Sequence, residues 1–189
     1  DRSVVRMQPS PSGPPTFESL ASYVQSWSLL SVERDLLIGS SAGVDVRGPD
    51  GQIQRLFDAH HVYSLHRSAV DASRIYAATG RGVRPLTYDD GAPQARARWT
   101  VEPYLPNLNT EARTVAEADD GTLWVGTTFD GVYRVRFDAE DTTHVDHFGP
   151  DDGLPPDRVE PYRWNGRVVF GTSTGLLRFE DGPTPRFEP

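Results

Sequence analysis

The sequence DDGTLWVGTTFDG at residues 119–131 decides the fold. An apolar run stops at Gly-Thr, a few polar residues follow, and a second glycine restarts the chain. A single copy would indicate one β-hairpin, because glycine accepts the positive φ of tight turns between strands. Further copies elsewhere in the chain would instead indicate a repeat protein.

The pattern occurs four times. The other copies are LLIGSSAGVDV from Leu36, IYAATGRGVRP from Ile75 and VVFGTSTGLLRF from Val168. Each copy has a small residue, a hydroxyl and a restart glycine: Gly39, Ser40 and Gly43; Ala78, Thr79 and Gly82; Gly126, Thr127 and Gly131; Gly171, Thr172 and Gly175. The restart glycines are 39, 49 and 44 residues apart. This is the period of a β-propeller blade and is too long for a leucine-rich or hexapeptide solenoid.

Each repeat unit contains four strand-like segments. The second is apolar nearly throughout, which predicts cover on both faces by neighbouring blades. The third alternates, and we expect Tyr133, Val135 and Phe137 on one side, with Arg134 and Arg136 facing solvent. In the last two units the segments are 113–119, 122–128, 131–137 and 144–148, then 159–164, 167–172, 175–180 and 185–189.

The sequence therefore predicts an all-β chain, a β-propeller segment of about four four-stranded antiparallel blades that is part of a larger ring. We expect blades at residues 21–59, 60–104, 105–150 and 151–189, after a linker or the remnant of a preceding blade at residues 1–20. An open segment leaves one blade face uncovered at each end, so self-association through these open edges is expected.

Composition excludes several classes of partner. The 189 residues are 37% hydrophobic, enough for one sizeable core, and 17 glycines with 16 prolines favour turns over long helices. A net charge of -8 disfavours nucleic acid. No cysteine is present for a disulfide or a thiolate metal site. No apolar run approaches the roughly 20 residues of a membrane span, so no direct membrane contact is expected.

No motif indicates catalysis, a cofactor or a metal. Asp119, Gly121 and Trp124 satisfy the core of the Asp-box, a turn that stabilises hairpins in sialidase-type propellers, and we interpret them as structural. A sialidase would need a cluster of three arginines, and no arginine recurs in register. His144 and His147 would lie on opposite faces of a strand, which prevents joint binding of one metal ion.

Ligand binding is expected at the loops that converge around the mouth of a propeller channel. An aromatic and a charged group together suit a sugar, through stacking and hydrogen bonds to hydroxyls. The alternative at each position is an ordinary exposed loop residue. The candidates are Arg81, Phe129 and Asp130 between second and third strands, and His60, His61 and Tyr104 between blades.

Residues 118–134, ADDGTLWVGTTFDGVYR, resemble the two-component regulator propeller repeat, which carries Leu-Trp-x-Gly-Thr, a short connection and then Gly-Leu or Gly-Val. GLP at residues 153–155 resembles the family's segment leading into the next blade, and YLPN at 104–107 is a degraded copy. The resemblance covers residues 23–188 and is weaker in the first two units, where Leu37 and Tyr76 replace the tryptophan.

The resemblance implies a non-catalytic sensor region on the periplasmic or extracellular side of a bacterial membrane. Such regions belong to histidine kinases, often of the hybrid two-component type, and sense an external small molecule or oligosaccharide. Two other functions remain open. The blades could form a protein–protein interaction scaffold, or a secreted carbohydrate-active propeller.

Overall fold

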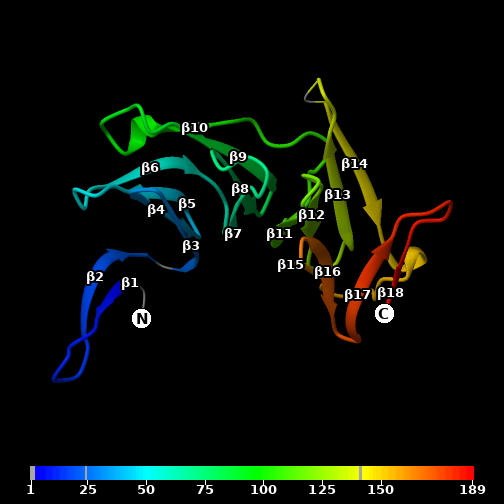
Figure 1. Cartoon of the computed structure of the whole chain (residues 1–189), viewed down its shortest axis with the longest axis horizontal. Helices are drawn as coiled ribbons and strands as arrows, with labels where there is room; N and C mark the ends of the chain where they lie inside the picture. The colour runs from blue at the N-terminus through cyan, green and yellow to red at the C-terminus, as the bar shows by residue number, and fades with distance from the viewer. Residues whose placement is uncertain (1–2, 24, 141) are drawn as a thin grey trace.

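The structure, a computed structural model, describes residues 3–23, 25–140 and 142–189. It contains four four-stranded antiparallel sheets, preceded by a two-stranded sheet, and the prediction of an all-β chain with propeller-like blades is confirmed. The sheets stand side by side along an arc, with the N- and C-termini near its opposite ends (Figure 1). No helix in the described part of the chain is long and apolar enough to cross a membrane.

Strands follow one another in chain order, and we number the four complete sheets as blades. The N-terminal hairpin is β1 (Ser3–Gln8) and β2 (Thr16–Ser22). The first blade is β3 (Ser26–Val32), β4 (Asp35–Ser40), β5 (Gly43–Arg47) and β6 (Ile53–Asp58); the second is β7 (Val62–Arg67), β8 (Arg74–Thr79), β9 (Gly82–Tyr88) and β10 (Trp99–Val101). The third is β11 (Thr114–Glu117), β12 (Leu123–Gly126), β13 (Val132–Phe137) and β14 (Thr143–Phe148); the fourth is β15 (Glu160–Trp164), β16 (Arg167–Thr172), β17 (Gly175–Glu180) and β18 (Arg186–Glu188). Two 3-10 turns, Arg96–Arg98 and Pro150–Asp152, interrupt the connections.

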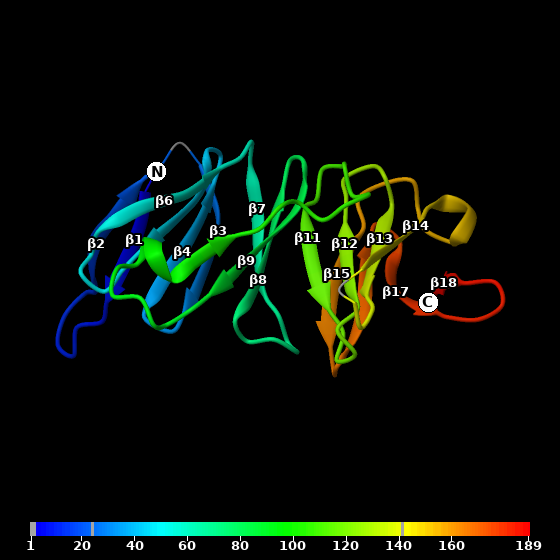
Figure 2. The same cartoon turned by 90° about the horizontal axis from the view of Figure 1, so that it is seen from above.

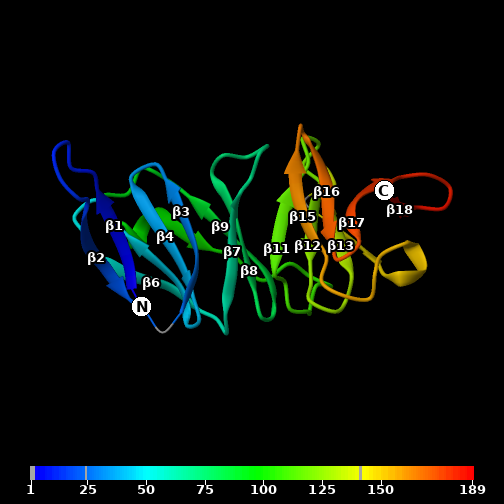
Figure 3. The same cartoon turned by 90° about the horizontal axis from the view of Figure 1, so that it is seen from below.

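The first strand of each blade lies on the concave side of the arc, and the fourth strand lies on the convex side (Figure 1). β3 contacts β7, β7 contacts β11, and β11 contacts β15, so the four first strands form a continuous concave wall. The turned views show the same succession of sheets (Figures 2 and 3). First strands line the central channel of propellers, and the concave wall is the corresponding surface.

The Gly-Thr and restart-glycine pattern forms the turn between second and third strands. Thr127 Oγ1 donates to the carbonyl oxygen of Gly131 at 3.0 Å and accepts from the amide of Asp130 at 2.8 Å. Gly131 has φ 59°, and a Cβ there would lie 2.0 Å from the carbonyl oxygen of Phe148. The same hydroxyl bond joins Ser40 to Gly43 at 3.2 Å, Thr79 to Gly82 at 2.9 Å and Thr172 to Gly175 at 2.9 Å.

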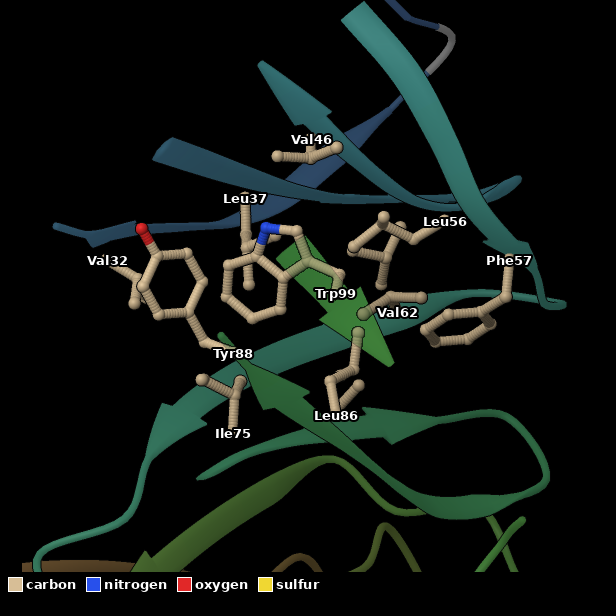
Figure 4. Close-up of a cluster of buried hydrophobic side chains, with 12 residues drawn as sticks. Val32, Leu37, Val46, Leu56, Phe57, Val62, Ile75, Leu86, Tyr88 and Trp99 are labelled. Carbon is tan, nitrogen blue, oxygen red and sulfur yellow. The ribbon is translucent and has the colours of Figure 1, made fainter. Parts of the chain in front are cut away.

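Apolar layers fill the spaces between the blades, because burying one face of each sheet is the main stabilising term. The layer between the first two blades contains Leu37, Val46, Ile75 and Leu86 packed around Trp99 (Figure 4). The second and third layers gather residues of the next blade pairs in the same way. The second strands β4, β8 and β12 are buried nearly throughout, as predicted, whereas β16 of the fourth blade is only partly covered.

The last two segments that cross between blades each insert a leucine into a layer. Leu105 of YLPN is 6% exposed and Leu154 of GLP is 3% exposed. Leu105 joins the layer between the second and third blades, and Leu154 joins the layer between the third and fourth. Each of the two segments therefore helps to fill the layer between the blades that it connects.

Arg134 does not face solvent, and the expectation for this side chain was wrong. It is 8% exposed, and its guanidinium carbon lies 5.0 Å from the Phe179 ring centroid. It forms ion pairs of 2.8 Å with Asp146 and 2.9 Å with Asp181. The fourth blade covers this side of β13, so the arginine alternating with Val135 is buried by a neighbouring sheet.

The segment expected as a linker or a remnant of a preceding blade, residues 1–20, contains most of the N-terminal hairpin. β1 and β2 pair antiparallel, with Met7 opposite Phe17 and Arg6 opposite Glu18. β2 continues to Ser22, so the boundary expected after residue 20 falls inside this strand. The hairpin lies beside the first blade at one end of the arc (Figure 1).

Candidate functional site

Two β-bulges shape the concave wall. The strand pairing skips Trp27 in β3 and Tyr63 in β7, at equivalent places in the two repeats. A bulge leaves one residue unpaired and redirects its side chain, and bulges are frequent beside functional sites. Arg113, which precedes β11, occupies the same repeat position in the third blade. Three successive blades thus place an aromatic or cationic side chain at one level of the wall.

His61 joins the two bulge residues to form an aromatic cluster. Its ring centroid lies 5.0 Å from that of Trp27 and 5.5 Å from that of Tyr63, and the Trp27 and Tyr63 rings are 5.3 Å apart. These separations are typical of interacting aromatic pairs. His61 has φ 58°, a left-handed conformation that non-glycine residues adopt rarely and that is often found at binding sites.

The backbone holds His61 in this conformation. The amide of Gly80 donates to the carbonyl oxygens of His60 at 3.0 Å and His61 at 3.1 Å. A Cβ at residue 80 would lie 2.6 Å from the His60 carbonyl oxygen, so this approach requires glycine. The β8–β9 turn therefore fixes the segment between the first two blades.

Arg113 and Glu111 complete the cluster on the third-blade side. The Arg113 guanidinium carbon lies 4.0 Å from the Tyr63 ring centroid, a cation–π contact. Glu111 accepts from the Tyr63 hydroxyl at 3.3 Å and from the Thr128 hydroxyl at 2.9 Å, and lies 3.6 Å from Arg113 Nε. Burial and then the Glu111 charge raise the pKa of Tyr63, which keeps its phenol neutral.

These side chains line a cavity of about 460 Å³, which we call the aromatic–cationic cavity. Its walls are Trp27, His61, Tyr63, Ser64, Arg113, Thr114 and Arg158. The hydroxyls of Ser64 and Thr114 are buried and have no hydrogen-bond partner among the described residues. An unsatisfied buried hydroxyl costs roughly 1–3 kcal/mol, so a polar group able to pair with either hydroxyl would be favoured.

The six candidate ligand residues do not form one site. His61 lines the aromatic–cationic cavity, and His60 contacts His61 with ring centroids 4.1 Å apart. The guanidinium of Arg81 lies 5.4 Å from the ring centroid of Tyr104, away from the cavity walls. Phe129 is 84% exposed and lines a separate pocket of about 240 Å³, which shares Glu111 with the cluster.

Asp130, the sixth candidate, is bound within its own hairpin and to neighbouring side chains. It accepts from the Tyr133 hydroxyl at 2.6 Å and from the Thr110 hydroxyl at 3.2 Å, and lies 3.4 Å from His147. Burial, followed by the hydrogen bond to Asp130, raises the pKa of Tyr133. These contacts hold the β12–β13 turn against β14.

Asp119 also connects the third blade to the fourth. Its carboxylate binds Arg163 of β15, and its amide donates to the carbonyl oxygen of Gly166 at 3.0 Å. Within the turn, Asp120 and not Asp119 accepts from the amide of Thr122, at 2.9 Å. Over the described residues, no group of three or more His, Cys, Asp or Glu side chains is arranged to hold a metal ion.

Sequence reasoning missed Trp27, Tyr63 and Arg113. Their signal appears only when the first strands are aligned through their partners in the second strands. Gly39, Ala78 and Gly126 pair with the residue that follows each of the three. The strand pairing of the structure, and not the repeat spacing by itself, places these side chains at one level of the concave wall.

Comparisons with known proteins bear on the fold. No protein-family model and no curated protein matches the sequence. Two structures of the extracellular domain of BT4673 from B. thetaiotaomicron, described as a putative hybrid two-component system and as a putative one-component system, are similar. Each has a TM-score of 0.64 and 23% identity, over 87% of this chain and 21% of that chain. The computationally designed Ika4 protein is similar with a TM-score of 0.56 and 15% identity, over 90% of this chain and 94% of that chain.

Proposed function

We propose that this chain is a non-catalytic, ligand-sensing part of the periplasmic or extracellular region of a membrane two-component sensor kinase. The blade arrangement that it shares with the BT4673 extracellular domain supports this role, as does the repeat at residues 118–134. The chain spans about a fifth of that domain. The observation that carries the proposal is the aromatic–cationic cavity on the concave wall.

The chemistry of the cavity suits an oligosaccharide or a similar small molecule rich in hydroxyl groups. The ring of Trp27, which is 39% exposed, offers an apolar face for the C–H groups of a sugar ring. Arg113 and the unpaired hydroxyls of Ser64 and Thr114 offer hydrogen bonds to sugar oxygens. Few polar groups at fixed positions beside aromatic surface are typical of ligand sites.

The hydrogen bonds of Glu111 are directed at residues of the aromatic cluster and the neighbouring hairpin. Its carboxylate is engaged by Tyr63 and Thr128 and lies beside Arg113, so it orients the aromatic and cationic side chains. In this arrangement Glu111 is a positioning residue for the cavity.

The test is binding of the 189-residue chain to an array of immobilised oligosaccharides, with positive glycans then titrated by calorimetry. We expect Trp27→Ala and Arg113→Ala each to weaken binding about tenfold or more, since tenfold corresponds to about 1.4 kcal/mol. His144→Ala is the matched control, because His144 is exposed and pairs with Asp138 within the β13–β14 hairpin.

Mass spectrometry of the bound glycan separates sensing from catalysis. An intact glycan after incubation supports the proposal. Hydrolysis would instead favour the secreted carbohydrate-active alternative. Binding that survives both cavity substitutions, or no binding by any glycan or small metabolite, would contradict the proposed site.

A further inference from the structure

Exposed apolar side chains gather at the two ends of the arc. The N-terminal face is the outward side of the hairpin and carries Val5, Met7 and Phe17, which are 50%, 56% and 66% exposed. The C-terminal face is the outward side of the fourth blade and carries Tyr162, Trp164 and Leu176, which are 49%, 67% and 67% exposed. Contiguous exposed apolar groups of this kind mark interaction surfaces.

The C-terminal face has the pattern of a face between two blades. On the third blade, Ala116 and Val132 are 3% and 0% exposed because the fourth blade covers them. The same repeat positions on the fourth blade are Tyr162 and Leu176. The face therefore has the apolar pattern of the stacked faces inside the arc, and no sheet among the described residues covers it.

The N-terminal face is also an exposed apolar surface. Successive residues of β1 point to opposite sides of the hairpin, and Val4 is 6% exposed whereas Val5 is 50% exposed. Met7 and Phe17 are paired across the two strands, so they extend the apolar surface that begins at Val5. One side of the hairpin is therefore buried, and the opposite side is apolar and exposed.

We propose that a second copy of this chain covers these faces, with the N-terminal face of each copy packed on the C-terminal face of the other. The arc curves so that its two ends turn toward the same side (Figure 1), which favours closure by two copies over an open filament. Two copies contribute eight four-stranded blades, the upper end of the range of about 4 to 8 found in propeller rings, together with the two N-terminal hairpins. Closure removes both open ends.

The net charge of the chain predicts how the association of two copies depends on salt. Each copy carries a net charge of -8, so two copies repel at long range, whereas the two apolar faces attract on contact. Added salt screens the repulsion and strengthens apolar burial. Association should therefore increase with salt, in contrast to association based on ion pairs.

The test is the mass of the 189-residue chain in solution, by sedimentation or light scattering over a range of concentrations. We expect a dimer for the unchanged chain. Phe17→Glu and Trp164→Glu should each raise the dissociation constant at least about 30-fold, as loss of an aromatic hot spot does. Phe129→Glu is the control, because Phe129 is 84% exposed but lies at a hairpin tip away from both faces.

Mixing the two end variants tests the head-to-tail arrangement. Phe17→Glu keeps an intact C-terminal face and Trp164→Glu keeps an intact N-terminal face, so the mixture should associate through one interface although neither variant does alone. Circular dichroism checks folding, and Leu176→Glu replaces Trp164→Glu if the latter unfolds. The proposal would be overturned if the unchanged chain is a monomer, if only one of the two end substitutions weakens association, or if the mixture of variants stays monomeric. A monomeric unchanged chain would indicate instead that the two faces contact other parts of a longer chain.

Discussion

The ion pair between Asp35 and Arg98 joins the first blade to the second through the interior. Asp35 begins β4, and Arg98 ends the 3-10 turn before β10; their side chains are 0% and 1% exposed. Arg98 Nε donates to Asp35 Oδ2 at 3.0 Å, and a second bond joins the guanidinium to Oδ1. The indole nitrogen of Trp99 donates to Asp35 Oδ2 at 3.0 Å.

Asp35→Asn removes the charge and leaves a buried guanidinium without its counterion. The remaining acceptors of Arg98 are the neutral carbonyl oxygens of Ala92 at 3.2 Å and Pro93 at 3.0 Å. Breaking a buried pair in this way costs roughly 3–5 kcal/mol. A domain of this kind has about 5–15 kcal/mol of unfolding free energy, so the variant should lose a large part of its stability.

Urea unfolding of the unchanged chain and its variants measures this cost. Asp90→Asn is the matched control, because Asp90 pairs with Arg34 at 2.7 Å on the surface, where such pairs contribute about 1 kcal/mol or less. The double substitution Asp35→Leu with Arg98→Met should recover much of the loss, since it removes both buried charges. Equal unfolding free energies for Asp35→Asn and Asp90→Asn would refute the reasoning.

Three further predictions concern the blades. Trp124→Ala, which empties a ring cluster beside Phe170 at 4.9 Å, should lower the unfolding free energy by about 3–5 kcal/mol in the same urea assay; a loss below about 1 kcal/mol would contradict the packing. Gly131→Ala should lower the melting temperature because its Cβ meets a backbone oxygen at φ 59°, whereas Gly149→Ala, with open space around it, should not. Burial, and then the charge of Arg163, lowers the pKa of His66, although Glu117 lies 4.0 Å away. As the pH falls, His66 is therefore protonated at a higher pH in the unfolded chain than in the folded chain. This contribution to stability is full above pH about 6.5 and falls as the pH drops toward the folded-state pKa; thermal melts of the unchanged chain and His66→Leu should therefore diverge in their slope with pH below about 6.5.

The repeat could be predicted because its chemistry is local. The hydroxyl of Thr127 and the positive φ of Gly131 belong to one turn, and both are visible in the sequence as Gly-Thr followed by a restart glycine. The alternation of strands and turns follows from the same signals. Each blade could therefore be predicted from its own residues, without knowledge of the neighbouring blades.

Features that depend on contacts between blades could not be predicted. The alternation of apolar and charged residues in β13 predicts that Arg134 is exposed, yet the fourth blade buries it beside Phe179. Trp27 and Tyr63 meet only because bulges in two different blades redirect them toward the same part of the concave wall. Periodicity assigns a side chain to one face of its own sheet, but the blade packed against that face determines its burial.

The proposed function requires that the concave wall receives an external ligand. Hydrogen exchange of the chain with and without its best-binding oligosaccharide tests this claim most directly, because it reports where backbone amides become protected. We predict slower exchange at residues 25–28, 61–64 and 111–114, around the aromatic–cationic cavity. Protection confined to the convex strands or to the two ends of the arc, with these segments unchanged, would contradict it.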